Sequence, residues 1–274
     1  MNIAFVGGGN MATAIIGGLV AKDGEPRDFR VVEPLPEQQA RLAGKFPGIG
    51  IFGAPTAGAI AGADLVVLAV KPQQMRAAAT ALAPWVADVP VVLSIAAGTR
   101  IADLARWLGG YARIVRAMPN TPALIGAGIS GLYATPDVGD GGRALATRVL
   151  EATGAVLWVE REDLLDAVTG VSGSGPAYVF YFLEGLEAAA QALGFGHAEA
   201  RRLAYATFAG AVKLAQASDL DPAVLRAQVT SKGGTTERAL SVLEGNAVKA
   251  TFVAAVRAAA DRARAMGDEF GRDA

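Results

Sequence analysis

Residues 2–12 read NIAFVGGGNMA, and this stretch decides what the first half of the chain is expected to be. An apolar run ends at three glycines, and a helical pattern follows from about residue 11 to residue 21. Further apolar runs then alternate with helical patterns over short links, which predicts an α/β Rossmann-type, doubly wound parallel sheet. The predicted strands are residues 2–6, 29–33, 49–52, 64–70, 90–95 and 113–117.

The glycines fit the pattern Gly-x-Gly-x-x-Ala, in the strand-to-helix context that a dinucleotide site requires. Gly7 permits a tight turn, Gly9 lets the backbone approach a pyrophosphate, and Ala12 allows the helix to pack closely on the strand. The free N–H groups at the helix start then face the phosphates. A plain strand-to-helix turn is the alternative. The residues predicted to bind cofactor here are Gly7, Gly9, Asn10, Met11 and Ala12.

The pattern changes after about residue 160, where helical periodicity continues without a convincing strand. We therefore expect two domains, a dinucleotide-binding domain over residues 1–160 and a helical domain over residues 161–274 for substrate binding and dimerisation. The predicted helix 176–193 is apolar around most of its circumference, so it must be covered on all sides. A homodimer built on the helical half would cover it, and a central helix within one subunit is the alternative.

Composition excludes several classes of site. The chain has no cysteine and a single histidine, His197, so disulfides, thiolate nucleophiles and zinc-thiolate sites are impossible and no metal site is expected. The 25 basic and 26 acidic residues leave no basic surplus that would call for nucleic acid. Neither a signal peptide nor a membrane-spanning stretch is visible, and we expect a cytoplasmic protein without a membrane partner.

Glu33 ends the second predicted strand, where an acidic side chain usually holds the ribose hydroxyls and favours NAD over NADP. The following residues, PLP at 34–36, offer no group for a 2′-phosphate. A solvent-facing Glu33 at the rim of the sheet is the alternative. Lys71 follows the fourth strand and is either a cation site for cofactor or substrate, or a residue that starts a helix. Small residues after the fifth strand would let a nicotinamide ring lie against backbone, and they are Ala96, Ala97 and Gly98.

The segment VTSKGGTTE, residues 229–237, places hydroxyls and two glycines before a helix. Several backbone N–H groups can converge there on one anion, aided by the helix dipole. This makes a carboxylate seat without an arginine. An ordinary helix N-cap is the alternative, because Thr or Ser with a nearby Glu is also a capping signature.

The segment 229–237 resembles the signature of the pyrroline-5-carboxylate reductase family, and other segments agree with that family in order and spacing. They span nearly the whole chain and read GGGNMA at 7–12, AVKP at 69–72, SIAAG at 94–98, RAMPNTP at 116–122 and DAVTGVSGSGPAY at 166–178.

The resemblance implies roles by position. The glycine loop would hold the cofactor pyrophosphate, and the turn at 229–236 would hold the substrate carboxylate through backbone amides. Thr236 matches the threonine whose hydroxyl approaches the ring nitrogen, Ser231 lies in the same loop as a second catalytic candidate, and Glu162 matches an acidic position near the proline site. The other implied contacts are Ala69, Val70, Lys71, Pro72, Ala96 and Ala97 for the cofactor, and Gly233, Gly234 and Thr235 for the substrate.

The family implies reduction of 1-pyrroline-5-carboxylate to L-proline with NADPH, and NADH is a close second because of Glu33. It also implies a dimer through the helical domain, with dimers joining into larger rings such as a decamer. Two departures stand out: Lys232 replaces a common proline, and Thr56 replaces an asparagine that often touches the adenosine part. The alternatives are a hydroxyacid dehydrogenase of similar architecture and a non-catalytic dinucleotide-binding sensor.

Overall fold

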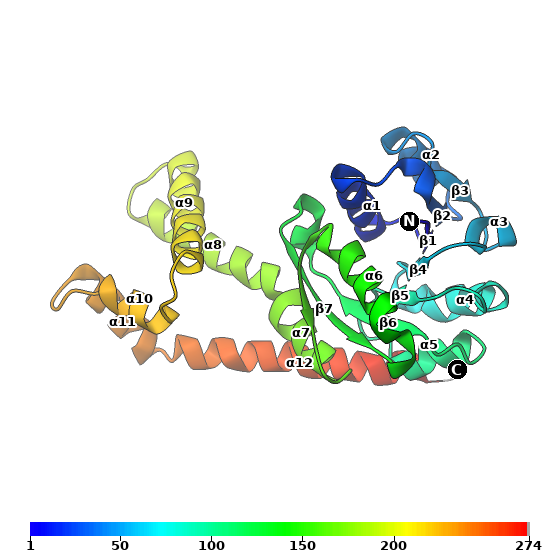
Figure 1. The fold of residues 1–274 in the computed structure, drawn as a ribbon. Coiled ribbons are helices and arrows are strands. Elements are labelled where there is room, and N and C mark those ends of the chain that lie inside the picture. Colours follow the sequence, from blue (N-terminus) through cyan, green and yellow to red (C-terminus); the bar gives the residue numbers. More distant parts are fainter. Residues whose placement is uncertain (273–274) are drawn as a thin grey trace. The chain divides into compact units, whose positions relative to one another are not determined.

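The computed structural model describes residues 1–272, which form two compact units (Figure 1). The first unit combines Met1–Ser174 with the segment that begins at Ala258, and the second is Gly175–Arg257.

The first unit is built on one eight-stranded sheet, with strand order β3-β2-β1-β4-β5-β6-β7-β8. Strands β1 to β6 are parallel, which confirms the predicted Rossmann-type sheet, whereas β7 is antiparallel to β6 and β8 is parallel to β7. The two last strands were not predicted. The strands are β1 Ile3–Val6, β2 Phe29–Val32, β3 Gly50–Phe52, β4 Leu65–Leu68, β5 Val92–Ser94, β6 Ile114–Met118, β7 Gly128–Ala134 and β8 Gly154–Trp158.

Helices cover both faces of this sheet, as the uninterrupted apolar strand β4 predicts. Apolar side chains of α1, α2 and α6 pack on one face, and those of α3, α4 and α5 pack on the other. The bounds are α1 Asn10–Lys22, α2 Pro36–Lys45, α3 Ala57–Ile60, α4 Pro72–Leu82, α5 Ile101–Trp107, α6 Gly139–Glu151 and α7 Leu164–Val168. Short 3₁₀ turns lie at Pro26–Asp28, Ala83–Trp85, Thr121–Ile125 and Pro136–Val138, and a π-helical turn, Thr169–Gly173, follows α7.

The second unit is all-helical, as predicted. Its helices α8 and α12 pack through aromatic rings, since Tyr178 and Phe182 of α8 each lie 5.6 Å from the Phe252 ring of α12. Much of α8 is nevertheless open within one chain, where Tyr181 is 72% exposed and Phe180 57%. A central helix covered within one subunit, the alternative considered above, is therefore wrong. The bounds are α8 Gly175–Ala192, α9 His197–Gln216, α10 Pro222–Gln228, α11 Thr235–Gly245 and α12 Val248–Gly271.

The compact units do not coincide with the two expected domains. Helix α7 belongs to the sheet unit because Leu165 and Asp166 are buried there, at 0% and 1% exposed. The last turns of α12 also belong to the sheet unit, although the sequence places them after every other helix. The domain division at residue 160 stays a prediction.

Within residues 1–272, no single helix has the length and hydropathy to cross a membrane, although α11 and α12, bent by 52° at their junction, reach that threshold as a pair. Over the same residues, no group of three or more His, Asp or Glu side chains could hold a metal ion.

Two adjacent glycines of α1 give a test of the helix packing. A methyl group on Gly18 would overlap the Ala152 carbonyl, whereas one on Gly17 would lie 3.8 Å from the Phe46 ring, an ordinary contact. We expect Gly18→Ala to lower the free energy of unfolding by about 1–3 kcal/mol through overpacking. Gly17→Ala should leave it unchanged or raise it by up to about 1 kcal/mol through helix propensity. Urea denaturation of both variants measures this, and equal stabilities would contradict the packing.

Candidate active site

The glycine loop has the geometry that its sequence predicts. Gly7 has φ +99°, and a Cβ there would lie 2.8 Å from the Ala69 carbonyl oxygen and 2.9 Å from Val70 Cγ1, so only glycine fits. Gly9 caps α1 in an extended conformation, with no atom within 4 Å of the place where its Cβ would be. The backbone at Gly9 therefore borders open space, so a ligand could approach it closely.

Helix α1 presents its first amides at this loop. The first helical hydrogen bond runs from Thr13 N–H to the Gly9 carbonyl at 2.9 Å, so the N–H groups of Asn10, Met11 and Ala12 precede it. No side chain caps the helix, Asn10 is exposed, and Ala12 is fully buried against the sheet. Uncapped amides at the positive end of a helix dipole fit a phosphate group.

Glu33 is a brace of the glycine loop as well as a candidate ribose ligand. Its side chain is only 7% exposed, its Oε2 accepts from Gly8 N–H at 2.9 Å, and its Oε1 accepts from Leu35 N–H at 3.0 Å. Gln38 donates from its side-chain amide to the Gly8 carbonyl, and Gln39 Nε2 donates to the Glu33 carbonyl at 2.6 Å. The interpretation of Glu33 as a solvent-facing residue is therefore wrong. Its contact with ribose stays a prediction.

Two more loops follow β4 and β5, the next two strands after β1 in the strand order. Because β1, β4 and β5 are adjacent and parallel, the loops after them lie at one edge of the sheet. Lys71 is exposed and is the N-cap residue of α4, with Pro72 in the first turn, which fits a helix start and leaves the side chain unassigned. In the loop after β5, Ala96 is 5% exposed and Ala97 is half-buried. The sheet thus brings the predicted cofactor residues to one edge.

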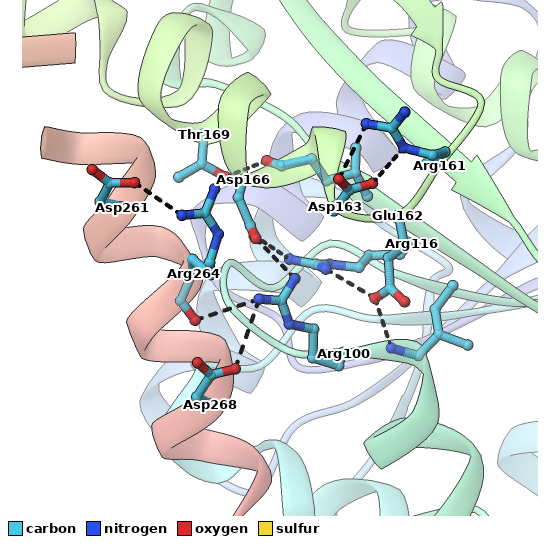
Figure 2. Close-up of polar contacts among 12 residues, drawn as sticks. Arg100, Arg116, Arg161, Glu162, Asp163, Asp166, Thr169, Asp261, Arg264 and Asp268 are labelled. Carbon is cyan, nitrogen blue, oxygen red and sulfur yellow. Dashed lines mark hydrogen bonds and ion pairs between the residues drawn. The ribbon is translucent and has the colours of Figure 1, made fainter. Parts of the chain in front are cut away.

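A cluster of four charged side chains lies on the α5 side of the sheet (Figure 2). Arg116 of β6, 2% exposed, pairs with Glu162 at 2.9 Å and with Asp166 of α7 at 3.5 Å. Asp166 also pairs with Arg100 Nη1 at 2.8 Å, and Glu162 Oε1 accepts from the Ile101 N–H that begins α5, at 2.9 Å. We call Arg100, Arg116, Glu162 and Asp166 the charged cluster.

Sequence reasoning missed most of this cluster. It assigned no role to Arg100, Arg116 or Asp166, and it expected Glu162 to lie near the substrate. The available signal was a charge inside an apolar run, as in IVRAM and LLDAV, because buried charges need partners. The substrate contact of Glu162 stays a prediction. Nearby, a hydrogen bond from Arg161 lowers the pKa of the exposed Asp163 carboxyl, which lies outside the cluster.

The turn before α11, in the second unit, contains the two glycines of the predicted anion seat, whose role stays a prediction. Gly233 has φ +71°, and Gly234 N–H donates to the Ser231 carbonyl at 3.0 Å. The first helical bond runs from Arg238 N–H to the Gly234 carbonyl, so three amides precede it, those of Thr235, Thr236 and Glu237. The N-cap residue of α11 is Gly234, so no Ser or Thr side chain caps the helix, although the Glu of the alternative capping signature does bond back to the turn.

One amide of this turn already holds a carboxylate. Gly233 N–H donates to Oε2 of Glu237 at 2.7 Å, so a side chain of α11 itself occupies this amide. Thr236 is half-buried, while Ser231 and Thr235 are exposed. Of the three uncapped amides, those of Thr235 and Thr236 belong to residues that also carry a hydroxyl group, and their contact with substrate stays a prediction.

Sheet, glycine loop and helical second unit together define an oxidoreductase of the nicotinamide-dinucleotide class. The family model for "NADP oxidoreductase coenzyme F420-dependent" matches residues 2–98, and that for "Pyrroline-5-carboxylate reductase dimerisation" matches residues 162–266. The pyrroline-5-carboxylate reductase of Pseudomonas aeruginosa is 43% identical over 270 residues, 98% of each chain. The chain belongs to the pyrroline-5-carboxylate reductase family.

Solved structures agree. The Coxiella burnetii pyrroline-5-carboxylate reductase superposes with a TM-score of 0.90 at 38% identity, over 97% of this chain and 98% of that one. The Plasmodium falciparum pyrroline carboxylate reductase, solved with NADP bound, gives a TM-score of 0.86 at 27% identity over the same shares.

The double hydrogen bond of Glu33 gives a test of the brace. In Glu33→Gln only one side-chain oxygen remains, so either the buried N–H of Gly8 or the partly buried N–H of Leu35 loses its acceptor. We expect a loss of about 1–3 kcal/mol in the free energy of unfolding, the cost of an unsatisfied buried donor. Glu37→Gln, in the first turn of α2 and exposed, is the control and should stay at the wild-type value. A Glu33→Gln variant as stable as the control would show that these two hydrogen bonds do not stabilise the glycine loop.

Proposed function

We propose that this chain reduces 1-pyrroline-5-carboxylate, a cyclic imine, to L-proline with hydride from a nicotinamide dinucleotide, the last step of proline biosynthesis. Identity over nearly the full length of curated reductases is the observation that carries the proposal. It favours the reductase over both alternatives, the hydroxyacid dehydrogenase and the non-catalytic sensor. A sensor would also have no need of the amide-lined turn before α11.

Cofactor binding is assigned to the sheet edge. The open space at Gly9 and the uncapped amides of α1 suit a pyrophosphate, and the small residues Ala96 and Ala97 suit a flat nicotinamide ring. When bound, the cofactor supplies the hydride that the imine carbon accepts. The protein's part is to orient the reactants and exclude competing geometries.

The second unit supplies the substrate seat in this proposal. The amides of Thr235 and Thr236 hold the carboxylate, with Gly233 and Gly234 shaping the turn. Thr236 places its hydroxyl against the ring nitrogen and favours the protonated imine, the better hydride acceptor. A hydroxyl of ordinary pKa is a poor acid at neutral pH, so the proton is relayed from water through Thr236. Ser231 is assigned to the same relay.

NADPH is assigned as the preferred cofactor, with NADH a close second. The NADP-bound relative supports this order, and the carboxylate of Glu33 opposes it by repelling a 2′-phosphate. Each Glu33 oxygen already accepts one backbone N–H, which reduces the negative charge that a phosphate would meet.

The match to the dimerisation model supports a homodimer through the helical unit. In the second unit, an apolar cavity of about 870 Å³, lined by Phe182, Leu240, Leu243, Phe252 and Val253 among others, offers the surface that a second copy would fill. A larger ring such as a decamer and a cytoplasmic location complete the proposal.

Reduction of the cyclic imine, followed at 340 nm with NADPH and NADH side by side, tests the proposed activity. We expect turnover with both cofactors and a higher kcat/KM with NADPH. No turnover of the imine with either cofactor, in a protein that still binds them, would refute the activity. A higher kcat/KM with NADH would reverse only the cofactor assignment.

Removal of one hydroxyl tests the relay. We expect Thr236→Ala to lower kcat by about tenfold to a hundredfold, near the low end of general acid–base contributions. Thr236→Ser keeps the hydroxyl and should retain most of the turnover, which separates proton relay from packing. Unchanged kcat in Thr236→Ala would remove Thr236 from the mechanism.

A further inference from the structure

The loop after β5 rests on the last turns of α12. Gly98 has φ +69°, and a Cβ there would lie 3.2 Å from Cβ of Met266 and 3.4 Å from the Phe270 ring. Two hydroxyls here are buried, Ser94 Oγ at the end of β5 and Thr99 Oγ1 within the loop, and neither makes a hydrogen bond within the described chain. These hydroxyls therefore do not hold the loop in place.

Two glycines bring α12 close to this loop and to α5. A Cβ on Gly267 would lie 2.6 Å from Nε of Arg100, and one on Gly271 would overlap the Asp103 carboxylate. Arg106 of α5 also donates to the Gly271 carbonyl at 2.9 Å. Any larger residue at position 267 must displace the Arg100 side chain.

Arg100, which follows the loop, contacts both Asp166 and α12. Its Nη1 pairs with the buried Asp166 at 2.8 Å, and its Nη2 donates to the Arg264 carbonyl of α12 at 3.4 Å (Figure 2). The next residue, Ile101, donates its N–H to Glu162 at 2.9 Å. The end of the loop is thus fixed between the carboxylates of the charged cluster and α12. The Arg100 side chain that makes these contacts is only 21% exposed.

We propose that Arg100 and Gly267 are positioning residues. Through them, the last turns of α12 fix the position of the residue 95–99 loop, so that the loop supports the nicotinamide ring. The inference rests on the proposed function, which assigns that loop to the nicotinamide. Neither residue touches the reacting atoms. The effect is on geometry, since a shift of about 1 Å in a positioned group can cost on the order of a hundredfold in rate.

Gly267→Ala is the first test, because the added methyl group displaces Arg100 without changing any charge. We expect the dissociation constant and KM for NADPH to rise on the order of tenfold, with kcat falling and KM for the imine unchanged, as a tilted ring predicts. Gly44→Ala is the matched control: it adds the same methyl group in α2, where no atom lies within 4 Å. It should behave as wild type.

Arg100→Lys is the second test, and it does not depend on the first variant folding. Lysine keeps the charge opposite Asp166 but loses the planar fork that also reaches the Arg264 carbonyl. We expect the same NADPH-specific rise, smaller than in Gly267→Ala. Arg262→Lys, in the exposed pair with Glu269 on the same helix, is its control.

The outcomes separate the two proposals, because NADPH binding is measured by its fluorescence without turnover. A wild type that binds NADPH but reduces no imine refutes the reductase and leaves the positioning test standing. Folded Gly267→Ala and Arg100→Lys variants with wild-type affinity and KM for NADPH overturn the inference. Equal losses in KM for NADPH and for the imine also overturn it, since they indicate a general loss of structure.

Discussion

Arg116 places a guanidinium in the middle of a sheet, at 2% exposure, and that charge must be neutralised where it lies. Two carboxylates, those of Glu162 and Asp166, pair with Arg116 and neutralise its charge. These ion pairs hold α7 and the residues before it against the sheet. Removal of one partner from a buried pair typically costs about 3–5 kcal/mol, so this contact is a strict constraint. Asp166 then recruits Arg100, and Glu162 caps α5. One buried charge therefore orders a strand, two helices and a loop of the candidate site.

Local patterns were enough to predict the parallel part of the fold. Strands such as LVVL in β4 are continuous apolar runs between breakers, and the helical half has clear periodicity, so type and place followed from the sequence. Strand β7 escaped prediction because its sequence GISGLYA carries two glycines, which are poor strand formers. Strand β8 escaped because it lies at the edge of the sheet, where its burial is incomplete. Helix α6 was not predicted either, because it begins with GDGG and glycine and aspartate are poor helix formers.

The candidate site was predictable where chemistry is carried by backbone conformation. Gly7 and Gly233 lie at positive φ where the motifs place them, because glycine adopts that conformation without the strain that other residues meet. The rest depends on tertiary contacts that spacing does not encode. Glu33 was interpreted as a ligand or a surface residue, but it accepts from the very loop it was expected to assist. The partners of Arg100 lie 66 and 164 residues away along the chain, beyond the reach of any local pattern.

The sheet unit is discontinuous in sequence, with its last contribution separated from the rest by the whole second unit. During synthesis, domains generally fold as units from the N-terminus onward. Here the strands are synthesised before the second unit, whereas the turns of α12 that carry Gly267 and Gly271 are synthesised after it. The nascent protein therefore passes through a stage in which its sheet is formed and the loop after β5 is still unsupported. On the proposal that this loop supports the nicotinamide ring, cofactor affinity comes only after the sheet itself has folded.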